Sequence, residues 1–205
     1  KNSSGTGILN IISGSFTGNS ATNGGAIYSQ GEMTISGGTF DSNTASASGG
    51  AIQNSGKLVI TGGTFTNNTA DYGGVIGNKT GATLEISGGS FKSNTATNIG
   101  GVIQNDGTSV TITGGTFDSN SATNNAGVLN NANSKGIVTI SNASFTNNKA
   151  TYGGALYNIG TLTINSGTFT GNSVTKQGGA MRHTGGTLTI NGGTFESNSS
   201  TGAGA

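Results

Sequence analysis

The feature that most constrains the fold is a short motif that returns at a nearly constant interval through the chain. A phenylalanine followed three residues later by an asparagine occurs eight times, and successive phenylalanines are 24 to 28 positions apart. The phenylalanines are Phe16, Phe40, Phe65, Phe91, Phe117, Phe145, Phe169 and Phe195, and the asparagines are Asn19, Asn43, Asn68, Asn94, Asn120, Asn148, Asn172 and Asn198. Such an interval is typical of repeat proteins, in which every copy forms the same structural unit.

Two further patterns surround each copy. An isoleucine stands five residues before the phenylalanine, and a leucine, valine or methionine stands two residues before that. Apolar residues two apart predict a short strand with one buried face. A second motif follows in seven copies: a Gly-Gly pair (Ala-Gly in one), then Ala or Val, then a large apolar residue. Two residues further on, an inward-facing asparagine recurs as Asn54, Asn78, Asn105, Asn131 and Asn158.

Together the motifs predict an all-β fold, a right-handed parallel β-helix (β-solenoid) of about eight coils of 24–28 residues with three short strands per coil. The 40 glycines and the two-residue period exclude a helical repeat, and the right-handed sense follows from the general preference of parallel crossovers. Stacked coils share a core that one coil cannot form alone. We treat residues 1–205 as a single β-helix repeat domain and expect it to be a fragment of a longer surface protein.

In such a fold each side chain lies above the same residue type of the preceding coil. We therefore predict that the eight phenylalanines, the eight asparagines that follow them and the five later asparagines form structural ladders, meaning columns of like side chains in contact. Stacked amides provide partners for buried polar groups, each of which would otherwise cost about 1–3 kcal/mol. The only histidine, His183, takes the place of the later asparagine near the end of the chain, and Ser29 takes it near the start.

The paired motifs F-x-x-N and G-G-A-[I/L/V] resemble the repeats of chlamydial polymorphic membrane proteins. They are also similar to the repeats of adhesin-like surface proteins of methanogens and gut anaerobes. The likeness covers nearly the whole chain, since eight copies of one motif and seven of the other keep regular offsets. The resemblance implies a surface-exposed β-helix associated with adhesion.

The composition argues against several classes of function. A net charge of +1 gives no electrostatic reason to expect nucleic acid or an anionic membrane as partner. Without cysteine the chain has neither a disulfide nor a thiolate metal site. No stretch approaches the ~20 apolar residues of a membrane span. We expect no metal, no cofactor and no direct membrane span in this chain.

A polysaccharide-degrading enzyme resembling pectate lyases is the first alternative function. Acid–base work on a sugar needs two carboxyl groups about 5–9.5 Å apart. Asp41, Asp118 and Glu196 share the position after phenylalanine but belong to coils two, five and eight, which separates neighbours by roughly 14 Å. Lys92, one coil from Asp118, predicts an ion pair instead. We therefore expect no enzymatic activity.

Ice binding is the second alternative. Two parallel columns on the outer side of the first strand are rich in threonine and are similar to the ice-binding faces of some antifreeze proteins. Glu85 interrupts one column, and threonine is also the ordinary choice on an exposed strand. One column contains Thr34, Val59, Glu85, Thr111, Thr139, Thr163 and Thr189, and the other contains Ser36, Thr61, Ser87, Thr113, Ser141, Asn165 and Asn191.

A candidate contact face lies on the strand after the Gly-Gly motif, where polar and aromatic residues are out of phase with the core. It consists of Tyr28, Gln53, Gln104, Tyr157 and Arg182, beside a strip of small apolar residues (Ala26, Ala51, Val75, Val102, Val128, Ala155 and Ala180). An exposed strip of this kind favours contact with a protein or a glycan. In the opposing interpretation, the loops that carry Tyr72 and Tyr152 cover it.

The sequence thus predicts a non-enzymatic adhesin or structural β-helix rod, at the cell surface or secreted, that mediates attachment or self-assembly. The expected partners are a protein or glycan on another cell or surface, or other copies of the chain.

Overall fold

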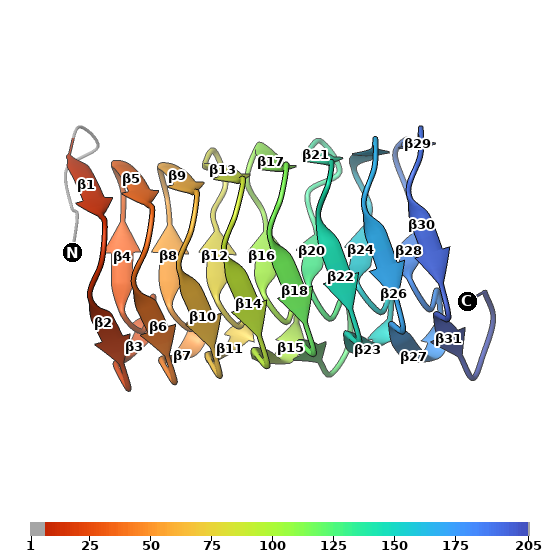
Figure 1. Cartoon of the computed structure of the whole chain (residues 1–205), viewed down its shortest axis with the longest axis horizontal. Coiled ribbons are helices and arrows are strands. Elements are labelled where there is room, and N and C mark those ends of the chain that lie inside the picture. Colours follow the sequence, from red (N-terminus) through yellow and green to blue (C-terminus); the bar gives the residue numbers. More distant parts are fainter. Residues whose placement is uncertain (1–6, 205) are drawn as a thin grey trace.

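The computed structural model describes residues 7–204, and these residues form four parallel β-sheets that run side by side along one axis (Figure 1). Within each sheet, neighbouring strands are four elements apart in the sequence, so each coil contributes one strand to every sheet. Three sheets have eight strands and one has seven. The described chain therefore makes seven complete coils and part of an eighth. This arrangement confirms the predicted parallel β-solenoid, and its right-handed sense stays a prediction.

The first two sheets contain the first and second strands of each coil. Sheet 1 is formed by β1 (Ile8–Ile11), β5 (Glu32–Ile35), β9 (Lys57–Ile60), β13 (Thr83–Ile86), β17 (Ser109–Ile112), β21 (Ile137–Ile140), β25 (Thr161–Ile164) and β29 (Leu188–Ile190). Sheet 2 is formed by β2 (Ser15–Thr17), β6 (Thr39–Asp41), β10 (Thr64–Thr66), β14 (Ser90–Lys92), β18 (Thr116–Asp118), β22 (Ser144–Thr146), β26 (Thr168–Thr170) and β30 (Thr194–Glu196).

The other two sheets complete each coil. Sheet 3 is formed by β3 (Ser20–Asn23), β7 (Thr44–Ser48), β11 (Thr69–Tyr72), β15 (Thr95–Ile99), β19 (Ser121–Ala122), β23 (Lys149–Tyr152), β27 (Ser173–Gln177) and β31 (Ser199–Ser200). Sheet 4 is formed by β4 (Ile27–Ser29), β8 (Ile52–Asn54), β12 (Ile76–Asn78), β16 (Ile103–Asn105), β20 (Leu129–Asn131), β24 (Leu156–Asn158) and β28 (Met181–His183).

Four strands per coil correct the predicted three. The additional strand is that of sheet 3, directly after the F-x-x-N motif. Its only inward apolar residue is small, an alanine in most coils, as at Ala70 and Ala96. An alanine buries little surface, so the alternation of Thr69, Ala70 and Asp71 does not stand out from the surrounding turn residues.

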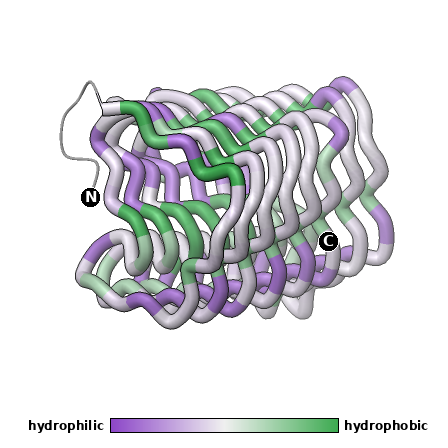
Figure 2. The backbone as a smooth tube through the Cα atoms, turned by 60° about the vertical axis from the view of Figure 1, so that its left-hand side comes forward, coloured by the Kyte–Doolittle hydropathy of each residue, from purple (hydrophilic) through white to green (hydrophobic). Residues whose placement is uncertain are grey.

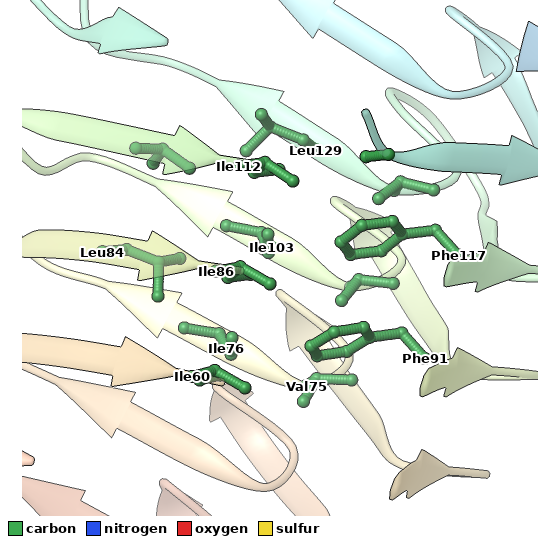
Figure 3. Close-up of a cluster of buried hydrophobic side chains, with 14 of the residues drawn as sticks. Ile60, Val75, Ile76, Leu84, Ile86, Phe91, Ile103, Ile112, Phe117 and Leu129 are labelled. Atoms are coloured by element: carbon green, nitrogen blue, oxygen red, sulfur yellow. The ribbon is translucent and has the colours of Figure 1, made fainter. Parts of the chain in front are cut away.

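The core consists of apolar columns that run along the solenoid axis. Register between coils is strict: Leu58 pairs with Leu84, Ile60 with Ile86, and Phe65 with Phe91. Figure 3 shows these aliphatic columns beside the rings of Phe91 and Phe117, with Val75 next to the Phe91 ring and Ile76 next to Ile60 and Ile86. Along the whole rod, hydrophobic positions recur at equivalent places in successive coils (Figure 2). Each coil thereby covers the apolar side of its neighbours.

The phenylalanines form one continuous stack. Successive ring centroids are 4.6–5.0 Å apart and the ring planes deviate by 3–10°. The six rings from Phe40 to Phe169 are completely buried. Parallel strands about 4.8 Å apart impose this near face-to-face geometry, although isolated rings prefer offset or edge-to-face contacts. The in-register pairing of the strands therefore determines the arrangement of the rings.

The asparagine after each phenylalanine forms a directional ladder. The Nδ2 of Asn94 donates to Oδ1 of Asn120 in the next coil (3.0 Å) and to the carbonyl of Phe65 in the preceding coil (2.9 Å). Its Oδ1 accepts from both the backbone N–H and Nδ2 of Asn68 (2.9 and 3.0 Å). Both amide hydrogens and the carbonyl oxygen are thus satisfied, and the pattern repeats from Asn43 to Asn172.

Asn148 keeps this pattern although its coil is the longest. It follows Asn120 by 28 residues, and the turn at 132–136, which precedes β21, takes up extra residues. Asn148 is nevertheless completely buried, and its Nδ2 donates to Oδ1 of Asn172 and to the carbonyl of Phe117, both at 2.9 Å. The ladder therefore tolerates differences in coil length, because these fall in the turns.

The two ends of the ladder differ from the prediction of a uniform column. Asn19 donates to Oδ1 of Asn43 at 2.8 Å, but its side chain is exposed because no described coil precedes it. Asn198 donates to the carbonyl of Phe169 at 2.8 Å but is only half-buried, and the ring of Phe195 beside it is 40% exposed. Both asparagines are therefore hydrogen-bonded members of the ladder, at its less buried ends.

The later asparagines form a second ladder in sheet 4. Nδ2 of Asn54, Asn78, Asn105 and Asn131 each donates to Oδ1 of the asparagine in the next coil over 2.6–2.8 Å. Asn158 continues the ladder to Nδ1 of His183 at 3.0 Å. His183 pairs in register with Asn158, and Ser29 pairs with Asn54 at the other end. Both therefore occupy ladder positions.

Removal of one central phenylalanine ring should lower the free energy of unfolding substantially. Phe91→Ala deletes a fully buried side chain that neighbouring coils hold in register, and a cavity of this kind costs about 3–5 kcal/mol. Thr111→Ser, on the outer side of sheet 1, should cost under about 0.5 kcal/mol. The measurement is the urea unfolding midpoint by circular dichroism, and equal midpoint losses in the two variants would contradict the core assignment.

Replacement of a ladder amide by a carboxylate tests the direction of the hydrogen bonds. In Asn94→Asp, an oxygen replaces Nδ2 and faces the oxygens of Asn120 and Phe65, so we expect a loss of about 3–5 kcal/mol at pH 7. Burial raises the pKa of the new carboxyl group above its unfolded value, so the loss should be smaller below pH 4 and grow as pH rises.

Asn98→Asp is the matched control for that variant. The Asn98 amide donates to the Tyr72 hydroxyl at 3.1 Å, and a hydroxyl can donate to a carboxylate instead. Unfolding midpoints across pH 3–8 should therefore change little for this control. A similar, pH-independent loss in both variants would mean that the buried ladder is not directional.

Candidate contact site

The predicted contact face is buried along its middle. Gln53 and Gln104 are 0% and 5% exposed, whereas Tyr28, Tyr157 and Arg182, nearer the two ends of the rod, are half-buried. All five lie in one column of sheet 4, together with Gly77 and Asn130. Of the possible contact face, Gln53 and Gln104 are therefore not accessible to a partner.

The strip of small apolar residues is also buried, because the chain departs from two-residue alternation at the Gly-Gly corner. The backbone N–H groups of Val75 and Ile76 both donate to the carbonyl of Val102. Two consecutive side chains consequently turn toward the core, as Figure 3 shows for Val75 and Ile76. The same pairing recurs at Ala51 and Val102, whose side chains lie in the core. The small apolar strip therefore belongs to the core, which differs both from an exposed strip and from one covered by the loops that carry Tyr72 and Tyr152.

A pocket of about 350 Å³ opens beside this column, between the ends of sheet 3 strands and the segments that follow sheet 4 strands. We call it the Tyr72 pocket. It combines residues from several coils and is lined by Asn23, Ala47, Ser48, Tyr72, Lys79, Gln104 and Asp106. Its lining begins in the first coil of the described chain, at Asn23, and ends in the fourth, at Asp106.

Tyr72 forms one rim of the pocket and is 37% exposed. Its hydroxyl oxygen accepts a hydrogen bond from Nδ2 of Asn98 in the next coil (3.1 Å). Oδ1 of Asn98 in turn accepts from Nδ2 of Asn124 at 2.8 Å. This chain of side-chain hydrogen bonds on the outer surface therefore fixes the orientation of the Tyr72 ring.

Asp106 also lines the pocket. Its Oδ1 accepts from Nε2 of Gln104 at 2.8 Å, and Oε1 of Gln104 accepts from Nδ2 of Asn130 at 2.8 Å. This buried chain of amides orients the carboxylate. Lys79, half-buried on the preceding coil, supplies the positive charge of the pocket.

Gly77, in sheet 4, lies next to the pocket-lining residue Ser48. Because Gly77 has no side chain, Ser48 and Gln53 can lie close to the backbone of this sheet. A Cβ at this position would stand 2.2 Å from Oγ of Ser48 and 2.8 Å from Oε1 of Gln53. The Gln53 amide instead lies across Gly77 and donates to its carbonyl at 2.8 Å. Oε1 of Gln53 is buried without a hydrogen-bonding partner.

At the far end of the same column, cations cover the aromatic rings. The Arg182 guanidinium lies 4.3 Å from the Tyr152 ring centroid and 5.5 Å from that of Tyr157, and Nζ of Lys176 lies 5.3 Å from the Tyr152 centroid. Tyr152 occupies the same column position as Tyr72, three coils away. The ring of Tyr152 is therefore already in contact with cationic side chains.

Asp41 and Asp118, two of the acids considered for sugar hydrolysis, and Glu85 on sheet 1 have separate partners. Asp118 pairs with Lys92 at 3.5 Å, and Glu85 with Lys57 at 3.9 Å. Asp41 accepts from the hydroxyl of Thr66, from Asn67 and from Ser42, and these hydrogen bonds, with Thr66 first, hold the pKa of Asp41 below its ordinary value.

The threonine-rich columns of sheet 1 lie on its outer side, with Glu85 exposed among them. Sheet 2 carries a further column that sequence reasoning missed, a serine or threonine before every phenylalanine. Its members are Ser15, Thr39, Thr64, Ser90, Thr116, Ser144, Thr168 and Thr194. The parallel column after phenylalanine contains Asp41, Lys92, Asp118 and Glu196 and is therefore mixed in charge.

Among residues 7–204, no group of three or more His, Asp and Glu side chains is placed to hold a metal ion. The same residues include no helix with the length and apolar character needed to cross a membrane.

Comparison with known proteins confirms the predicted resemblance. A profile of the Chlamydia polymorphic membrane protein repeat matches residues 13–30, 37–55 and 142–159. Each matched segment contains one F-x-x-N motif and one Gly-Gly-Ala motif followed by Ile or Leu. Comparisons with curated proteins and with solved structures give no match. The repeats and the β-solenoid fold fit a surface-exposed, passenger-like protein.

Two buried glycines with ordinary backbone angles should respond differently to a methyl group. A Cβ at Gly74 would meet the backbone carbonyls of Gly101 and Thr95 in the next coil at 2.2 and 2.7 Å, so Gly74→Ala should cost about 2–3 kcal/mol or more. At Gly77 the atoms in the way belong to side chains that can rotate, so Gly77→Ala should cost under about 1.5 kcal/mol. Thermal unfolding midpoints compare the two, and a larger loss for Gly77→Ala would contradict the described packing.

Proposed function

We propose that this chain is a non-enzymatic rod, at the cell surface or secreted, that attaches to a protein or glycan on another cell or surface, or to other copies of itself. The observation that carries the proposal is the match of three repeats to a surface-protein family on a solenoid whose inward positions are occupied by ladders. The recurring residues of the motifs stabilise the shaft. Contact with a partner is made by the outward-facing residues.

The shaft has the mechanical properties that such a role requires. Each coil is joined to the next by backbone pairing in four sheets, by a ring stack and by two amide ladders. Deformation at one coil breaks several of these contacts at once, so the outward residues keep fixed spacings of about 4.8 Å per coil. Fixed spacing lets several weak contacts act together, which raises overall affinity without any single strong site.

The placement of the acids supports the non-enzymatic part of the proposal. Asp118 and Glu85 face lysines across one coil, and Asp41 is surrounded by hydrogen-bond donors. Carboxylates in such arrangements are engaged with neighbouring side chains, whereas sugar hydrolysis needs two carboxyl groups about 5–9.5 Å apart that both face the substrate.

Retention of protein-coated beads tests attachment. Beads that carry the folded chain should remain on immobilised polysaccharides, matrix proteins or cell monolayers under flow, and an excess of soluble chain should release them. Beads coated with heat-unfolded chain serve as the control, because their composition is identical. Sedimentation velocity over a hundredfold concentration range measures self-association in parallel.

Two results would contradict the proposal. The first is equal retention of folded and unfolded coatings together with a monomer at every concentration. The second is depolymerisation of uronide or neutral polysaccharides, with or without Ca²⁺, by the purified chain, which would instead favour the enzyme alternative.

A further inference from the structure

We propose that the Tyr72 pocket binds a single pyranose ring of an uncharged glycan. This inference rests on the proposed attachment function and names the ligand class for it. The pocket joins side chains from the first four coils of the described rod, from Asn23 at the end of β3 to Asp106 after β16.

The volume limits the size of the ligand. At about 350 Å³ the pocket lies at the small end of the range for small-molecule sites, roughly 300–1,000 Å³. It can enclose one sugar ring, and the rest of a glycan would extend along the outer surface. A folded protein partner would instead need a broad contact of about 800 Å² on this side.

The charges in the pocket favour a neutral ligand. Lys79 and Asp106 contribute one positive and one negative charge, and the other lining residues are uncharged. A carboxylate or sulfate on the ligand would meet Asp106 as well as Lys79, so it would gain little and lose solvation. Hydroxyl groups suit both side chains, since they donate to the carboxylate and accept from the ammonium group.

The remaining lining matches the two faces of a sugar ring. Tyr72 offers a partly exposed aromatic surface for the C–H face, which is apolar. Asn23, Lys79 and Asp106 contribute polar groups for the hydroxylated edge, whereas the buried Gln104 amide is engaged with Asp106 and Asn130. An aromatic ring beside an amide, an ammonium group and a carboxylate suits a ligand that is apolar on one face and densely hydroxylated at its rim.

Both principal contacts are fixed in advance. Asn98 and Asn124 hold the Tyr72 hydroxyl, and Gln104 and Asn130 hold the carboxylate of Asp106. Ordering these side chains therefore adds little entropy cost on binding, which matters for a weak ligand such as one sugar ring. Tyr152, the equivalent residue three coils away, contacts Arg182 and Lys176 instead, so the sites differ although their backbones repeat.

Saturation-transfer NMR with methyl glycosides of glucose, galactose, mannose and N-acetylglucosamine tests the pocket directly. At least one should show transfer to its ring protons at about 10 mM, a concentration that detects weak binding. Tyr72→Ala and Asp106→Ala should each reduce affinity about tenfold or more, as expected for losing an aromatic contact or a charge-assisted hydrogen bond. Tyr72→Phe and the matched control Tyr152→Ala should stay within about threefold of the original chain.

Three outcomes would overturn the inference: no transfer to any of the four glycosides, transfer that persists in both pocket variants, or stronger binding of the charged sugar N-acetylneuraminic acid. Unfolding midpoints of the variants show that each remains folded. Bead retention separates this inference from the proposed function. Retention by the original chain without glycoside binding would overturn the pocket inference alone, whereas loss of retention in Tyr72→Ala would support both.

Discussion

In-register parallel pairing between successive coils is the constraint on which the rest of this structure depends. Because every strand lies about 4.8 Å from its counterpart, each residue type is forced above its own kind. Only side chains that interact favourably with copies of themselves are then suitable for the interior. Phenyl rings do so by stacking, aliphatic groups by packing, and asparagine by donating through Nδ2 and accepting through Oδ1. A charged residue cannot, because like charges would stack.

This requirement explains the composition as well as the repeat. Only 15 residues in the chain carry a formal charge, and the charges that occur on sheet 2 alternate in sign at Lys92 and Asp118. Glycine is abundant because the corners also stack. At Gly74 the carbonyl of the next coil occupies the space where a side chain would lie. The same spacing that stabilises the shaft thus restricts which residues can form its corners.

The interior was predictable from sequence because self-complementary residues recur at constant intervals. Phe65, Asn68 and Asn78 repeat at fixed offsets, and the structure places them in columns. The sheet 3 strand was missed because Ala70 is too small to mark a buried position. The paired inward turn of Val75 and Ile76 was missed because it depends on two N–H groups that share one carbonyl. Neither feature shows the alternation of large apolar and polar residues that marks a strand.

The Tyr72 pocket could not be predicted for the opposite reason. Its residues break the repeat: Tyr72, Lys79 and Asp106 each differ from the residues above and below them, and they come from different coils. Periodicity identifies what every coil shares, so it gives no information about a site made from exceptions. One of these departures from the repeat still indicates a local structural role. Gly77 is a glycine in a column that otherwise has longer side chains, and it allows Ser48 and Gln53 to close over the sheet below the pocket. The residues that every coil shares form the stacked interior. Binding specificity on such a scaffold therefore depends on the residues that differ between coils.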